Sequence, residues 1–200
     1  HFHRQRQRLL HDAGDYVGEA GALQALARLC FRQSKGVVRA VEAAKQAVAL
    51  FAGQTDEVSR EAQARAKLEL GKLQSQDWRH QRDALRSMEE ARADYRDLAH
   101  ASGEAEALIE QANYHCSKDN FSSAVLAVKK AYEICRKSES TDKKEKAEAS
   151  WEVAKLHMNE IKKRVDKGQD PKSLLQDAIA AALDSLPLFR AVRDEQREGE

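Results

Sequence analysis

The residues whose chemistry is easiest to recognise, the histidines and cysteines, are not spaced to form a metal site. His115 and Cys116 are neighbours, and adjacent side chains on a helix point about 100° apart, so these two cannot readily share one ion. The sequence contains no Cys-x-x-Cys or His-x-x-x-His pattern of the kind that binds zinc. We therefore expect neither a metal nor another cofactor.

Signatures of catalysis are also missing from the sequence. There is no Gly-x-Ser-x-Gly turn to present a nucleophilic serine, and no glycine-rich loop to hold a nucleotide phosphate. The many acidic residues lie at the spacing of solvated helix faces, as Glu133 does relative to Lys129. The sequence thus predicts a protein that is not an enzyme.

Composition restricts both the fold and the partners. The 200 residues carry 34 Lys and Arg against 33 Asp and Glu, and a net charge of +1 argues against nucleic acid as a partner. Two prolines and nine glycines are too few for the many turns of a β-sandwich or barrel, so we expect an all-helical chain. No uncharged apolar run reaches the roughly 18 residues that a membrane span needs.

Cysteine usage and the first residues bear on localisation. Cys30, Cys116 and Cys135 are odd in number and far apart, which argues against a disulfide framework and favours the cytoplasm or another reducing compartment. The sequence begins without a methionine or the apolar core of a signal peptide. We expect a soluble piece of a longer protein.

The elements that must position any binding residues repeat along the chain. Four small residues, Ala27, Gly71, Ala112 and Ala154, lie 44, 41 and 42 residues apart and serve as anchors for the repeat. Alanine stands seven residues before each anchor, and a second pair of small residues, seven apart, follows in each of the first three repeats. Small residues two helical turns apart let neighbouring helices approach closely. Because the other anchors are alanine, we expect Gly71 to lie at a close contact between helices.

These columns predict helix–turn–helix repeats of roughly 42 residues. The fourth repeat carries an insertion of about a dozen residues between its helices. The predicted segments are the tail of a preceding repeat at 1–17, repeats at 18–57, 58–101, 102–140 and 141–186, and a capping helix at 187–200.

The stretches around the anchors resemble the long variety of tetratricopeptide (TPR) repeat found in kinesin light chains and cell-polarity scaffolds. The likeness is carried by Glu61-Ala62-Gln63-Ala64 before Leu70-Gly71 and by Ala112-Asn113-Tyr114 continuing to Asn120-Phe121, and it covers nearly the whole chain. The usual proline after the second helix is absent. The resemblance implies an all-α, right-handed superhelical solenoid whose first helices line a concave face.

The resemblance also implies which residues face a partner. On the concave face we expect a polar row that is mostly basic, formed by Arg28, Arg32, Lys72, Asn113, Lys155 and Asn159. Beside it we expect an apolar stripe formed by Phe31, Leu68, Ile109, Trp151 and Met158, although aliphatic residues at helical spacing are often core instead. Such a face suits an amphipathic or extended protein segment that carries acidic residues.

The predicted function is that of a non-enzymatic scaffold or adaptor that binds a partner segment in the concave groove. Two alternatives are a stably integrated structural subunit of a larger assembly and a regulatory repeat segment of a longer signalling protein. A clamp for a terminal carboxylate is disfavoured, because three of its five expected positions are the acids Glu69, Glu106 and Glu110.

Two further expectations concern aromatic residues and the last segment. Trp78 and Phe121 lie near turns within repeats, where an aromatic side chain normally packs between the two helices. Beyond Pro187, apolar residues at i, i+1, i+3 and i+4 predict a short amphipathic helix that folds back on the fourth repeat and reaches toward Trp151.

Overall fold

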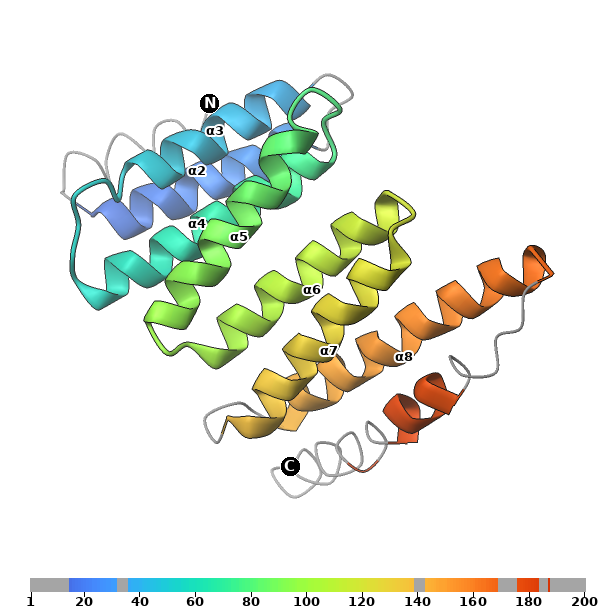
Figure 1. Ribbon diagram of the computed structural model, residues 1–200. Coiled ribbons are helices and arrows are strands. Elements are labelled where there is room, and N and C mark those ends of the chain that lie inside the picture. Colours follow the sequence, from blue (N-terminus) through green and yellow to red (C-terminus); the bar gives the residue numbers. More distant parts are fainter. Residues whose placement is uncertain (1–14, 32–35, 139–142, 169–175, 184–186, 188–200) are drawn as a thin grey trace, which may run out of the picture. The chain divides into compact units, whose positions relative to one another are not determined.

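The computed structural model of the chain describes residues 15–31, 36–138, 143–168, 176–183 and 187. These residues form helices joined by short turns, and no strand occurs among them, which confirms the all-helical prediction for this part of the chain. A helical segment, 176–183, follows the last labelled helix. The labelled helices are α2 (Tyr16–Phe31), α3 (Val37–Ala49), α4 (Glu57–Ser75), α5 (Gln81–Asp97), α6 (Ala101–Ser117), α7 (Phe121–Lys137) and α8 (Lys143–Asp166) (Figure 1).

The chain divides into two compact units, His1–His100 and Ala101–Glu200. In the N-terminal unit, α2 packs against α3 and α4 against α5, and α4 also contacts both α3 and α2 (Figure 1). In the C-terminal unit, α6 packs against α7, and α8 contacts both. The border between the units falls within one residue of the expected border between repeats 2 and 3. One continuous right-handed solenoid over residues 1–200 stays a prediction.

The repeated small residues occupy equivalent buried positions. The four anchors are buried, as are the second-helix pairs Ala40 and Ala47, Ala84 and Ala91, and Ala124 and Ala131. At Gly71 there is no room for a side chain, because an added Cβ atom would lie 2.7 Å from the Met88 Cγ and 3.0 Å from the Ala84 carbonyl oxygen. Gly71 therefore lets α4 and α5 approach, which confirms the prediction made from its alanine counterparts.

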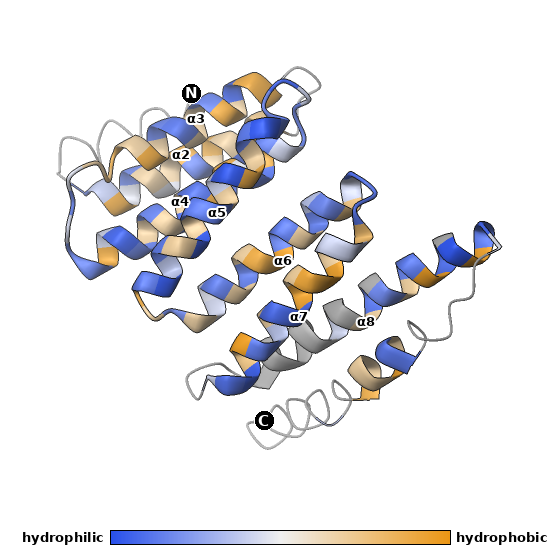
Figure 2. Cartoon of the chain, viewed as in Figure 1, coloured by the Kyte–Doolittle hydropathy of each residue, from blue (hydrophilic) through white to orange (hydrophobic). Residues whose placement is uncertain are grey.

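Larger apolar side chains fill the space around these small residues. Leu23, Val41 and Phe51 belong to the core of the N-terminal unit, and Leu108 and Val128 belong to that of the C-terminal unit. Polar and apolar residues are interspersed along helices α2 to α7 (Figure 2). Every helix in the described part of the chain is too short or too polar to cross a lipid bilayer.

Local hydrogen bonds define where the helices begin. At the start of α4, the Asp56 carboxylate accepts a hydrogen bond from the Ser59 backbone N–H at 2.9 Å, which satisfies a donor that the helix leaves unpaired. The same hydrogen bond lowers the pKa of Asp56. At the start of α7, the Asn120 side chain accepts a longer bond, 3.4 Å, from the Ser123 N–H.

The turn between α4 and α5 corrects one expectation. Trp78 is 80% exposed and does not pack between the two helices. The turn is held by Asp77 instead, whose carboxylate accepts hydrogen bonds from Arg79 Nε and Nη2, both at 3.1 Å, and lies 2.9 Å from His80 Nδ1. The bonds from Arg79, with a smaller effect of His80, outweigh burial and lower the pKa of Asp77 to about 2.

Candidate protein-binding surface

Four members of the polar row directly follow an anchor in the sequence, so their positions on the helices are set relative to the buried anchors. Arg28 directly follows Ala27 and Lys72 directly follows Gly71, so each cation stands about 100° around its helix from a buried small residue. From that position a long side chain can reach the surface while its stem lies beside the core. The side chain of Arg28 is 65% exposed and that of Lys72 is 27% exposed.

Arg28 and Lys72 meet around one carboxylate in the N-terminal unit. Arg28 Nη2 on α2 lies 3.5 Å from Glu69 Oε2 on α4, and Lys72 Nζ lies 3.4 Å from Glu69 Oε1. The three side chains carry a net charge of +1, and Arg28 is mostly exposed whereas Lys72 and Glu69 are largely buried. We call this group the Glu69 cluster.

Two members of the expected set lie at the end of α2. Phe31 is the last residue of that helix and is 37% exposed, so its ring is partly available at the surface. Arg32, which was expected to extend the basic row, lies outside the described residues.

The C-terminal unit carries the rest of the polar row. Asn113 and Lys155 directly follow the anchors Ala112 and Ala154, and both are exposed. Asn159, one turn beyond Lys155 on α8, is exposed as well. The Asn113 side-chain amide donates a hydrogen bond to Glu110 at 3.4 Å. Amide groups of this kind can both donate to and accept from a peptide backbone.

The expected apolar stripe is not a single surface feature. Leu68 is 1% exposed, so placing it on a groove open to a partner is wrong; it is a core residue, as aliphatic residues at helical spacing usually are. Ile109 is half-buried and packs against the core of the C-terminal unit. Trp151 and Met158 are different, with 48% and 53% of their surface exposed.

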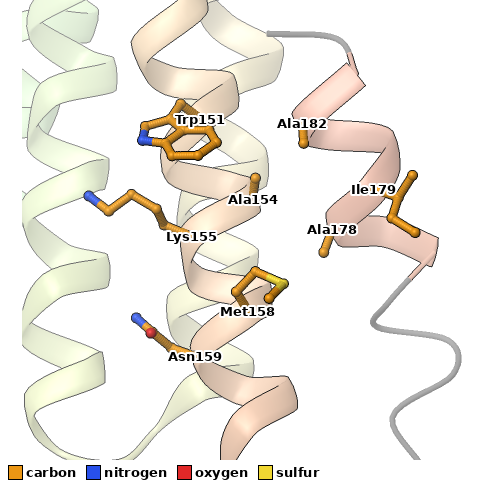
Figure 3. A pocket seen from close by; sticks show the side chains of 8 residues that line it. All are labelled: Trp151, Ala154, Lys155, Met158, Asn159, Ala178, Ile179 and Ala182. Carbon is orange, nitrogen blue, oxygen red and sulfur yellow. The ribbon is translucent and has the colours of Figure 1, made fainter. Parts of the chain in front are cut away.

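Trp151 and Met158 line an open pocket in the C-terminal unit with a volume of about 280 Å³. Ala178 and Ala182 approach it from the helical segment 176–183, across from α8 (Figure 3). Sequence analysis missed this wall. Ala178 stands twelve residues further from its anchor than Ala124 does, so the insertion in the fourth repeat hid the correspondence. The remaining lining residues are Ala154, Lys155, Asn159 and Ile179.

A buried histidine lies close to this pocket on α8. His157 is 1% exposed, and neither of its ring nitrogens has a hydrogen-bond partner among the residues that the structure describes. Burial lowers the pKa of His157, and the charge of Lys129 lowers it further, whereas Asp177 and Glu160 oppose the shift. Lys129 on α7 also pairs with Asp177 at 3.3 Å, which ties the segment 176–183 to α7.

The described surface offers ion pairing, hydrogen bonding and apolar contact. Within the described ranges, no three His, Cys, Asp or Glu side chains are grouped so that they could hold a metal ion. Comparison of the chain with protein family models and with curated proteins gives no match. Function is therefore inferred from the residues themselves.

Proposed function

We propose that this chain is a non-enzymatic protein-interaction module built from TPR-like helical repeats. In this proposal the polar row on its first helices binds a partner segment, amphipathic or extended, that carries acidic residues. The observation that carries the proposal is the Glu69 cluster, in which two cations from neighbouring helices, Arg28 and Lys72, share one carboxylate at the surface.

The energetics of the cluster favour exchange with a partner. An exposed ion pair contributes only about 0–1 kcal/mol to stability, because water screens it and long side chains lose freedom in forming it. A partner carboxylate can therefore bind Arg28, whose side chain is 65% exposed, at small cost to the fold, while Lys72 keeps its pair with Glu69. Like charge on Glu69 restricts where an incoming acid can sit, which gives the surface a preferred register.

The C-terminal unit supports the same mode of binding with different groups. Asn113 and Asn159 provide side-chain amides suited to the backbone of an extended segment, and Lys155 provides a further cation. Contacts of this kind give orientation and specificity, while the charges govern the rate of association and its dependence on salt.

The test compares proteins captured from a lysate by the full chain and by two charge-reversal variants. Arg28→Glu, Lys72→Glu and Lys155→Glu together should abolish capture of partners held by the wild-type chain. The control reverses three other exposed cations, Arg65→Glu, Arg86→Glu and Lys130→Glu, and should keep those partners. The two variants have the same net charge, so nonspecific electrostatics cannot separate them.

Capture that survives the first variant, or that is lost equally in both, would show that the polar row is not the binding surface. Capture of nothing by the wild-type chain would contradict the adaptor role itself. Circular dichroism of each variant verifies that the helices are retained.

A further inference from the structure

In each compact unit, the helix that follows the first pair of helices packs against both members of that pair. In the N-terminal unit α4 contacts α3 and α2, and in the C-terminal unit α8 contacts α7 and α6 (Figure 1). The furrow between the two helices of repeats 1 and 3 is thus covered by the first helix of the next repeat. The same arrangement occurs twice, in two separately packed parts of the chain.

A third furrow lies between α8 and the helical segment 176–183, and it is open in the described part of the chain. Its floor and walls are mainly apolar, with Ala154, Ala178 and Ala182 placed between the larger Trp151 and Met158 (Figure 3). The opening of about 280 Å³ can accept one or two large apolar side chains.

Equivalent positions in the third repeat show what a covered furrow looks like. Counted from the anchors, Trp151 and Met158 correspond to Ile109 and Cys116 on α6. Both of those residues are only partly exposed and pack against the core of the C-terminal unit, where α8 lies across α6 and α7. Trp151 and Met158 are about half exposed, at 48% and 53%.

On the other wall of the furrow, the segment 176–183, an apolar residue is again more exposed than its counterpart in the third repeat. Allowing for the twelve inserted residues, Ala178 corresponds to Ala124, and both are buried. The next residues, Ile179 and Val125, then correspond as well. Val125 packs against the core, whereas Ile179 is 51% exposed. Apolar residues on both walls of this furrow are therefore more exposed than their counterparts in the third repeat.

We propose that residues 188–200 of this chain dock in the furrow between α8 and the segment 176–183, with Leu188 and Phe189 against Trp151 and Met158. These thirteen residues lie outside the described ones and follow Pro187, which is four residues beyond the segment that forms one wall. The proposal gives Trp151 and Met158 a contact within the chain in place of a contact with a partner.

The sequence of this segment suits the furrow. Leu188, Phe189, Ala191 and Val192 fall on one face of a helix, and Arg190, Arg193 and Asp194 lie on the other, polar side. Glu195, seven residues after Leu188, returns to the first face and ends its apolar part. Thirteen helical residues extend about 20 Å, and the seven-residue step from Trp151 to Met158 extends about 10 Å. The segment as a whole is longer than this step, and its apolar part, 188–192, extends about 7 Å, enough to lie between the two side chains. A helix this short is unstable alone in water and gains its stability from such packing.

The test uses the fluorescence of Trp151 in the full chain. Trp78→Phe removes the other tryptophan, which is at the surface, so that Trp151 is the single reporter. We expect Trp151 emission to be blue-shifted and protected from acrylamide at protein concentrations where the chain is monomeric. Adding Leu188→Asp and Phe189→Asp should shift the emission to the red, raise quenching several-fold and lower the melting temperature.

Two further variants make the result specific. Arg190→Gln and Arg193→Gln change the net charge by the same amount on the polar side of the segment and should leave Trp151 protected. Phe189→Ala is a milder change that keeps the test valid if the double aspartate variant unfolds, and it should raise quenching by a smaller factor.

Three outcomes would overturn the proposal. One is a Trp151 that is exposed in the unmodified segment, or that stays protected when Leu188 and Phe189 are changed. Another is protection that appears only as the protein concentration rises, which would identify a second copy as the cover. The last is protection that appears only when a lysate is added. Because the readout is internal to the chain and needs no partner, it is separate from the test of the proposed function.

Discussion

At the scale of single residues, close helix packing depends on the absence of a side chain at Gly71. The hydrogen of Gly71 faces α5, where Met88 and the Ala84 carbonyl leave no room for a larger group. Overpacking a buried helix contact of this kind costs about 1–3 kcal/mol, because the neighbouring side chains and backbone must shift.

We expect Gly71→Leu to lower the free energy of unfolding by about that amount and to move the urea midpoint downward. Gly21→Leu is the matched control, because Gly21 is an exposed helical glycine and, among the described residues, no neighbouring group lies within 4 Å of the added Cβ position. That substitution should be neutral or stabilising, since leucine favours helix more than glycine does. Equal midpoints for the two variants would contradict the packing described for α4 and α5.

At the scale of elements, the ion pair between Lys129 on α7 and Asp177 on the segment 176–183 acts on a buried histidine of α8, His157. His157 is approached by Lys129 from α7, by Asp177 from the segment and by Glu160 from its own helix. Its pKa is lowered in the folded state, first by burial. The unfolded chain therefore takes up a proton at a higher pH than the folded chain does, and the stability that neutral His157 allows is lost as the pH falls below about 6.5.

We expect the free energy of unfolding of the wild-type chain to fall between about pH 7 and pH 5 by more than that of His157→Leu. Urea titrations at several pH values measure both. Val128→Ala serves as the control, because it truncates a buried side chain of α7 without removing a titratable group, and it should keep the wild-type pH dependence. A His157→Leu variant with the same pH dependence as the wild-type chain would show that His157 does not carry this effect.

The helices and their spacing could be predicted from the sequence because each close contact needs a small residue, and small residues recur at anchors such as Ala27 and Gly71. Surface assignments were less successful. Leu68 and Ile109 share a column with Trp151, but their burial depends on tertiary packing, which periodicity alone does not reveal. Trp78 lies beside a turn, yet the Asp77 hydrogen bonds hold that turn and leave the indole in water.

The wall of the furrow was missed for a different reason. The inserted residues of the fourth repeat shift Ala178 out of the column that Ala124 occupies, so the second helix of that repeat could not be aligned by spacing. Of the residues that directly follow an anchor, Arg28, Asn113 and Lys155 are exposed and Lys72 is half-buried, so helix geometry alone does not fix their exposure.

At the scale of the whole molecule, charges of both signs are nearly balanced, so partner selection depends on local groups and not on a general field. The net charge is +1 over 200 residues. Against that background the Glu69 cluster places two cations around one acid on neighbouring helices. A surface of this kind should lose affinity for its partner as salt increases, because screening weakens exposed charge pairs.

The central claim, that the polar row contacts an acidic segment of a partner protein, is tested most directly by site-specific photocrosslinking of the full chain. A photoreactive amino acid replaces Arg28, Lys72 or, as the control, the exposed Arg86 on α5, and the peptides captured from a lysate are sequenced. We expect the same Asp- and Glu-rich partner peptides at positions 28 and 72, none at position 86, and loss of the adducts at high salt. Equal adducts at position 86, or captured peptides without acidic residues, would contradict the account.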